Sequence, residues 1–229
     1  MFNVTHMWKV IFSFVLFLSL ASCIEISDDI SFKTDGSGTF KYVVNLSSSK
    51  VKVNSILSLD SLDGKKIPSI YQLKEKIEHY KEKIDSKEGI SNVKLDANFT
   101  DFIFKFSCDF SSVTTLQNAF KDLLNEEFKI KSTKIDEINW LLFEKNKVVR
   151  SVPILSLDLT SRLKKEDSEA LKRGKYSSIS RFDRPIERFD NSAAKLSANK
   201  MAVMIQTTPF SLIQNIKLLE NTIYLVELK

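Results

Sequence analysis

The sequence predicts an α+β fold: an antiparallel sheet built from β-hairpins, with amphipathic helices packed on one face. Two segments, 26–46 and 93–110, alternate polar and apolar residues around tight turns, as paired strands do. Two other segments, 70–86 and 113–128, repeat apolar residues at the spacing of an α-helix. Because a helix follows each hairpin, we expect both helices to cover the same face of one sheet.

The first hairpin spans residues 26–46 and reverses at Asp35-Gly36-Ser37-Gly38. Two glycines beside an aspartate supply the positive φ angles that a tight turn needs. This string lacks the ligand series of a calcium loop and the Gly-Lys-Thr ending of a phosphate loop, so we interpret it as a turn. The next segment, 47–69, fits either a short helix or a strand, and Asp63-Gly64 and Pro68 mark a turn within it.

The first helix is expected over residues 70–86, ending near Gly89. His79 lies on its polar side, one turn after Glu75. We interpret His79 as a solvated residue, because the sequence shows no partner residues for a ligand or a base. The apolar stripe that defines this helix consists of Ile70, Leu73, Ile77, Tyr80 and Ile84.

The second hairpin turns at Thr100-Asp101, and its second strand has the strongest β pattern of the chain. We expect this strand at the centre of the sheet. Cys108 belongs to the same row, which favours a small buried hydrophobe over an exposed catalytic thiol. Ser111-Ser112 then caps the helix over 113–128. The row that faces the core is Phe102, Phe104, Phe106, Cys108 and Phe110.

The C-terminal third predicts further strands and two short helices. A polar helix is expected over Lys164–Lys172, and Thr208-Pro209 starts another, with proline at the first helical position. Expected strands are Trp140–Phe143 and Val148–Val152 around a turn at Lys145-Asn146, Tyr176–Phe182, Glu187–Phe189, a strand through Met201, Val203 and Ile205, and Ile223–Leu228.

The N-terminal segment has the pattern of an export signal. Lys9 precedes the apolar run Val10–Leu18, which is shorter than the roughly 20 residues that cross a bilayer as a helix. The run has the length of a secretory h-region and ends in small residues. We therefore expect residues 1–22 to be removed, leaving one α+β domain over 23–229, with a subdivision near 130–150 as the alternative.

The tetrapeptide Leu20-Ala21-Ser22-Cys23 resembles the lipobox of bacterial lipoproteins. The resemblance implies cleavage between Ser22 and Cys23, a diacylglyceryl group on the Cys23 thiol and further acylation, for instance with palmitate, of the new amino group. It implies a lipid anchor in the bacterial cell envelope, in the inner or the outer membrane, with the bilayer as partner. A signal cut by the ordinary peptidase and an uncleaved short anchor remain the alternatives.

Three features together are similar to bacterial lipoproteins with an LppM-type domain. They are the lipobox with a strand directly after it, the hairpin turn at residues 35–38, and the run 182–197 with the strand after it. The resemblance implies an α+β domain on a lipid tether and no catalytic residues. Lys200 stands where we would expect a glycine-containing turn.

Composition excludes several kinds of chemistry. Of two cysteines, an acylated Cys23 leaves Cys108 without a disulfide partner. Of two histidines, His6 leaves with the signal, so the mature chain offers no His-rich zinc site, and we expect no metal or cofactor. The net charge of +5 is modest, and we expect no nucleic-acid partner.

The basic excess is local. Residues 162–188 carry nine Lys or Arg against five Asp or Glu. An anionic-ligand patch, for phosphate headgroups or another anionic polymer, is one interpretation, because arginine binds phosphate bidentately. A solvated, salt-bridged surface is the interpretation we favour. The candidate patch residues are Arg173, Arg181, Arg184 and Arg188.

The function that we expect is a membrane-anchored, non-catalytic envelope lipoprotein that binds a lipid, a glycan or a protein. The alternative is a structural or assembly accessory acting only through protein contacts. A hydrolase with a hidden carboxylate site is the least favoured, because Asp28-Asp29 and Glu126-Glu127 are sequence neighbours that point apart, and no Gly-x-Ser-x-Gly motif is present. We therefore name no catalytic residue.

Overall fold

The computed structural model of the chain describes residues 24–62, 64–128, 139–151 and 165–227. The predicted signal segment and Cys23 lie outside these residues. The strands are β1 (Glu25–Phe32), β2 (Gly38–Asn45), β3 (Ser61–Leu62), β4 (Lys65–Lys66), β5 (Ile90–Asn98), β6 (Ile103–Phe110), β7 (Leu141–Glu144), β8 (Lys147–Arg150), β9 (Lys175–Phe182), β10 (Ile186–Phe189), β11 (Lys195–Leu196), β12 (Ala202–Thr207) and β13 (Asn221–Leu225). The helices are η1 (Ser47–Ser49), α2 (Lys50–Leu57), α3 (Ile70–Asp85), α4 (Val113–Phe128), α6 (Lys165–Arg173), α7 (Pro209–Gln214) and η3 (Ile216–Leu219).

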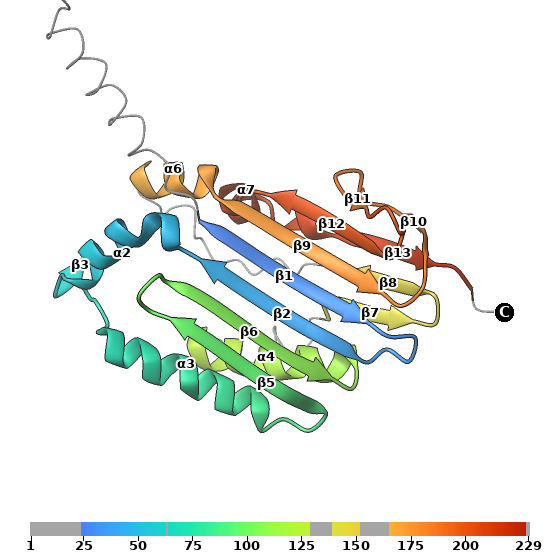
Figure 1. Cartoon of the computed structure of the whole chain (residues 1–229), viewed down its shortest axis with the longest axis horizontal. Coiled ribbons are helices and arrows are strands. Elements are labelled where there is room, and N and C mark those ends of the chain that lie inside the picture. Colours follow the sequence, from blue (N-terminus) through green and yellow to red (C-terminus); the bar gives the residue numbers. More distant parts are fainter. Residues whose placement is uncertain (1–23, 63, 129–138, 152–164, 228–229) are drawn as a thin grey trace, which may run out of the picture.

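A seven-stranded sheet in the order β11-β12-β9-β1-β2-β6-β5 forms one layer of the molecule (Figure 1). Both predicted hairpins are present, as β1–β2 and β5–β6, and they pair with each other through β2 and β6. The central strand is β1, which pairs with β9 in parallel, from Glu25 opposite Lys175 to Phe32 opposite Phe182. This parallel pairing joins segments about 150 residues apart in the sequence.

The expectation that the phenylalanine-rich strand lies at the sheet centre is wrong. β6 is the neighbour of the edge strand β5. The sequence of β6 is strongly apolar because one face of the strand is buried. A strand with one buried face can occupy any position in a sheet whose face is covered by a second layer. Phe102, Cys108 and Phe110 are indeed at most 3% exposed.

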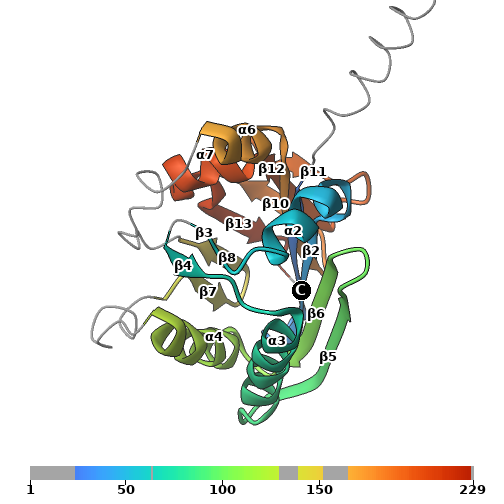
Figure 2. The same ribbon diagram turned by 90° about the vertical axis from the view of Figure 1, so that its left-hand side faces the viewer.

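A second sheet, in the order β10-β13-β8-β7, lies against the inner face of the first sheet, and α4 continues this layer beside β7 (Figure 2). The α+β class and the amphipathic helices are confirmed, and the second sheet adds a layer that the helical stripes did not indicate. Phe32 joins the two layers, because its ring stacks on Phe182 at 5.3 Å and on Phe143 at 5.9 Å between centroids.

Helix α4 is fixed to the second sheet by a buried side chain. The Gln117 Nε2 donates to the Leu141 carbonyl at 2.8 Å, and the Leu141 amide donates to Gln117 Oε1 at 2.9 Å. Gln117 therefore satisfies the open edge of β7, where an unpaired backbone would otherwise be buried. At the start of the helix, Ser112 Oγ accepts from the Thr115 amide at 3.1 Å, which confirms the predicted cap.

Two segments that sequence reasoning left open take a definite form. Segment 47–69 forms η1, α2 and the small β3–β4 hairpin, with Gly64 at φ +74°. Lys200 occupies the left-handed region at φ +60°, in the turn before β12 where a glycine was expected. The last strand ends at Leu225 rather than at the predicted Leu228, so Val226 and Glu227 follow it outside the sheet.

Candidate functional site

The end of the molecule where β1 begins is the end that an anchor on Cys23 would hold. β1 starts at Glu25, two residues after Cys23. The Lys175 amide donates to the Ile24 carbonyl at 2.7 Å, so the chain is already paired with β9 one residue after Cys23. Gly174 is required beside it, because a Cβ there would lie 2.9 Å from the Ile24 carbonyl oxygen. We call this the anchor end; α2, β3 and α6 lie there (Figures 1 and 2).

A buried polar cluster lies on the inner face of the large sheet, where β1, β8 and β9 meet. Asp28 is 3% exposed, and Arg150 donates to it through Nη1 to Oδ1 at 2.8 Å and through Nη2 to Oδ2 at 3.4 Å. Ser178 Oγ donates to Asp28 Oδ1 at 2.9 Å, and the Tyr176 hydroxyl donates to Oδ2. We call Asp28, Arg150, Tyr176 and Ser178 the Asp28 cluster.

The Asp28 cluster is a buried ion pair in which other side chains of the cluster already donate hydrogen bonds to the carboxylate. Burial raises the pKa of Tyr176, and the charge of Asp28 raises it further, so the phenol stays protonated as a donor. The guanidinium and the carboxylate balance each other, and both carboxylate oxygens accept hydrogen bonds. The cluster thus joins the second sheet to the first through Arg150, which is a structural role for these four side chains.

The sequence does not predict this arrangement, because Asp28 was considered there only as a carboxylate beside Asp29. A signal was present. Asp28 lies two residues from both Ile26 and Ile30, and this spacing places its side chain on the apolar face of the strand. A carboxylate on a buried face requires a cation and hydrogen-bond donors.

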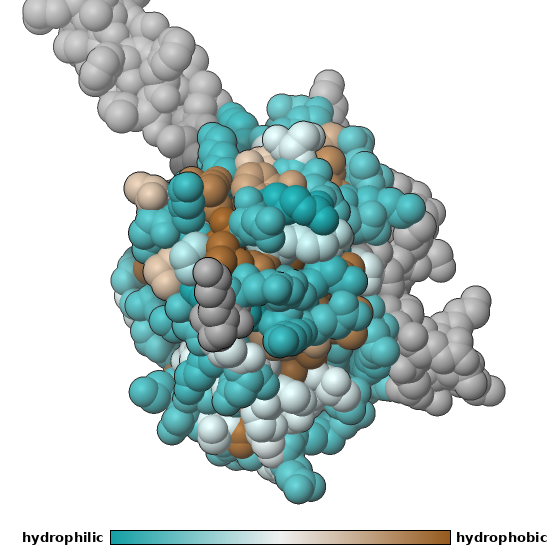
Figure 3. Space-filling model, turned by 90° about the vertical axis from the view of Figure 1, so that its right-hand side faces the viewer, coloured by the Kyte–Doolittle hydropathy of each residue, from teal (hydrophilic) through white to brown (hydrophobic). Residues whose placement is uncertain are grey.

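A shallow polar cavity of about 350 Å³ lies at the opposite end of the molecule, the end that Figure 3 shows. Asp109 accepts hydrogen bonds from Thr39 Oγ1 at 2.6 Å and from Asn92 Nδ2 at 2.8 Å. These two bonds lower the pKa of Asp109, so it stays ionised as an acceptor. Asn92 sits at φ +52° within a bulge of β5. The cavity can accept hydrogen bonds from a hydroxyl-bearing ligand, but Asp109 is not suited to act as an acid.

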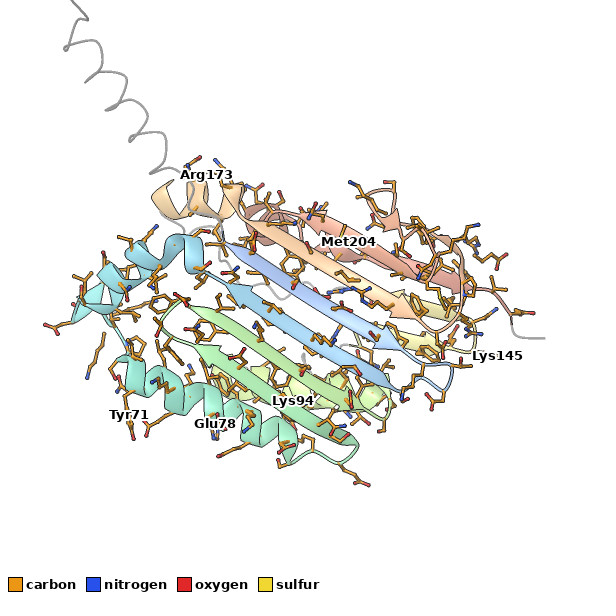
Figure 4. All side chains as sticks on the ribbon, viewed as in Figure 1. Tyr71, Glu78, Lys94, Lys145, Arg173 and Met204 are labelled. Carbon is orange, nitrogen blue, oxygen red and sulfur yellow. The ribbon has the colours of Figure 1, made fainter. Side chains whose placement is uncertain are left out.

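The structure does not bring together the four arginines of the candidate anionic-ligand patch. Arg173 ends α6 at the anchor end, whereas Arg184 donates to the carbonyl of Lys145 at the other end (Figure 4). Arg184 is 4% exposed and thus closed to a large ligand. Arg181 donates to Asp29 Oδ2 at 2.8 Å on the outer sheet face.

Arg188 belongs to the second sheet and makes two contacts there. Its Nη1 donates to Asp190 Oδ1 at 3.2 Å, and its guanidinium lies 3.3 Å from the centroid of the Tyr224 ring. Arg181 and Arg188 are therefore held in surface ion pairs, and Arg184 is buried against a backbone carbonyl.

The carboxylates considered for hydrolysis also lie apart. Asp28 and Asp29 point to opposite faces of β1, one buried and one paired with Arg181. Glu126 on α4 binds Lys83 and also accepts a hydrogen bond from His79 at 3.0 Å, and these contacts lower its pKa. His79 is thus an exposed residue of α3 with a partner on the neighbouring helix.

Cys108 is the buried small hydrophobe that the sequence predicted. It is 1% exposed, and burial, together with the charge of Asp109, raises its pKa to about 12. Within the described part of the chain, no three or more His, Cys, Asp or Glu side chains are grouped so as to hold a metal ion. No helix in that part has the length and apolar character needed to cross a membrane.

Comparison with known proteins gives one distant likeness. No family model matches the chain, and no curated protein matches it by sequence. The NMR structure of the folded domain of the Mycobacterium tuberculosis LppM protein is similar to it at a TM-score of 0.40 and 10% identity, over 88% of this chain and 89% of that one.

Proposed function

We propose that the chain is a bacterial envelope lipoprotein, anchored through acylated Cys23, whose domain binds a lipid, a glycan or a protein without catalysing a reaction. The observation that carries the proposal is the tetrapeptide Leu20-Ala21-Ser22-Cys23 at the end of a short apolar run. The cysteine is the reactive group, because its thiolate forms the thioether to the lipid.

The position of β1 supports the proposal. Only one residue, Ile24, separates Cys23 from the central strand β1. An anchor on Cys23 would therefore be joined to the folded domain with almost no linker. Two or three acyl chains hold a protein stably on a bilayer, whereas one chain gives only reversible binding. The folded domain then sits directly on the membrane surface.

The non-catalytic part of the proposal is supported by the state of the acidic groups. A catalytic acid needs a raised pKa, whereas Glu126 and Asp109 both have lowered ones. Asp28 and Asp29 are each bound by an arginine. The Cys108 thiol, with its raised pKa, is a poor nucleophile.

Membrane fractionation of the full chain tests the anchor, with Cys23→Ser as the variant and Cys108→Ser as the matched control. We expect the parent chain and Cys108→Ser to incorporate a labelled fatty acid and to stay with the membrane after a high-salt wash. Cys23→Ser should do neither. Equal membrane retention and no label in all three chains would overturn the proposal.

Crosslinking in membranes, followed by purification and mass spectrometry, then separates the kinds of partner. A reproducible protein partner with no bound lipid or glycan would favour the structural accessory over the lipid- or glycan-binding domain. A co-purifying lipid or glycan would favour the latter.

A further inference from the structure

The segment that follows β2 exposes a concentration of apolar side chains at the anchor end. Nine large hydrophobic residues in the described part of the chain are exposed, and five of them fall within residues 51–71. Val51 on α2 is 81% exposed and Tyr71 on α3 is 68% exposed. Single exposed apolar residues are normal on a soluble surface, whereas several of them gathered at one end of a fold are typical of a surface that contacts a partner or a membrane. The five are Val51, Leu59, Leu62, Ile70 and Tyr71.

The start of this segment lies at the same end of the large sheet as Ile24, the residue after Cys23. Asn45, the last residue of β2, pairs with Glu25, the first residue of β1. Helix α2 starts five residues after Asn45, so α2 lies at the same end of the large sheet as Ile24 (Figures 1 and 2). Two residues of extended chain reach about 7 Å, so an acylated Cys23 keeps Glu25 within that distance of the bilayer surface.

The charge of this end favours a negatively charged membrane surface. Residues 50–71 contain four lysines against two aspartates, and one of the lysines, Lys50, is paired with Asp101 at 2.9 Å. Lys65 and Lys66, the two residues of β4, are both exposed. On the other side of Ile24, Arg173 and Lys175 are exposed too, and the Tyr71 and Arg173 side chains both lie at this end (Figure 4). Basic side chains beside apolar ones are the composition of surfaces that lie in the headgroup region of a bilayer.

We propose that this anchor-end surface, made of the five exposed apolar side chains with Lys65 and Lys66, docks onto an anionic lipid surface and fixes the orientation of the domain on the membrane. The inference rests on the proposed anchor at Cys23. With this end against the bilayer, the polar cavity around Asp109 at the opposite end points away from the membrane.

The test uses a matched pair of leucines. Leu59 is 45% exposed at the anchor end, and Leu142 is 46% exposed on β7. Each is changed to cysteine in the full chain, and the mature acylated protein is labelled with an environment-sensitive fluorophore. The label is site-specific, because the Cys23 thiol is consumed in the thioether and burial of Cys108 raises its pKa to about 12.

The labelled chains are placed in vesicles of phosphatidylcholine and phosphatidylglycerol, with iodide as the aqueous quencher and a nitroxide lipid as the membrane quencher. We expect the nitroxide lipid to quench the probe at Leu59→Cys and iodide to quench the probe at Leu142→Cys. Changing Lys65→Gln or Lys66→Gln should lower the ratio of docked to undocked domain about fivefold per lysine. That loss should vanish in vesicles of phosphatidylcholine alone.

Each contrary outcome has its own signature. Equal quenching at both sites on an acylated chain overturns the docking surface and leaves the anchor standing. An unmodified Cys23 in the intact mass overturns the anchor itself. A probe at position 59 that becomes shielded without vesicles as protein concentration rises identifies a second copy as the occupant. Shielding in native membranes but not in pure lipid identifies a protein partner, and both results refute the lipid contact.

Discussion

Removing the guanidinium of Arg150 should destabilise the domain strongly. Arg150→Met keeps much of the side-chain volume and leaves Asp28 buried with its charge uncompensated. Breaking one partner out of a buried ion pair costs about 3–5 kcal/mol. For a chain of this size, that loss corresponds to a fall in melting temperature of roughly 6–20 °C.

The control is a second arginine–aspartate pair on the next residue of the same strand. Arg181 donates to Asp29 at 2.8 Å, but its side chain is 49% exposed, against 16% for that of Arg150. Exposed pairs contribute about 0–1 kcal/mol, so Arg181→Met should change stability little. The two variants thus compare the same chemistry on opposite faces of β1.

Urea unfolding of the mature chain, followed by circular dichroism, measures both variants. The double variant Asp28→Asn with Arg150→Met removes both charges together, and it should recover part of the stability that Arg150→Met loses. If Arg150→Met is no more destabilising than Arg181→Met, the reasoning about the Asp28 cluster is refuted.

Three further predictions follow from single contacts. Cys108 should resist a maleimide in the folded protein and react at once in urea, because it is 1% exposed and its pKa is raised to about 12; rapid labelling of the native chain would contradict this. Lys200 has a φ of +60°, which strains the backbone of a residue with a side chain. Lys200→Gly should therefore raise the free energy of unfolding by up to about 1 kcal/mol, and Lys200→Val should lower it. Urea midpoints that rank the two variants the other way would refute this backbone strain. Thr39→Val should cost about 1 kcal/mol at pH 7, because Asp109 loses a donor. The lowered pKa of Asp109 means that this contribution is present above its unfolded-state pKa and is lost as pH falls through the folded-state pKa; a loss that persists at acid pH would contradict it.

Local patterns in the sequence were sufficient for most individual elements. The alternation around Gly36 predicts β1–β2, and the helical stripes predict α3 and α4 nearly to their bounds. These predictions hold because strand and helix periods are fixed by backbone geometry, whatever the element packs against. The expected turn at Lys200 also exists, although the residue there has a side chain.

Pairings between distant segments were not predictable in the same way. The apolar face of β6 indicates burial, but burial does not specify which strand is the neighbour. The parallel pairing of β1 with β9, and the meeting of Asp28 with Arg150, depend on a topology that no local pattern contains. The candidate arginine patch shows the converse. Arg173 and Arg184 are close in sequence, but the eight residues of the extended strand β9 lie between them.

The mass of the N-terminal peptide of the membrane-bound protein tests the central claim most directly. The account predicts a peptide that begins at Cys23, lacks residues 1–22, and carries diacylglycerol on the thiol. A peptide that retains Ser22, or one that begins elsewhere with Cys23 unmodified, would contradict the lipid anchor. It would also remove the basis for docking the anchor end on a membrane.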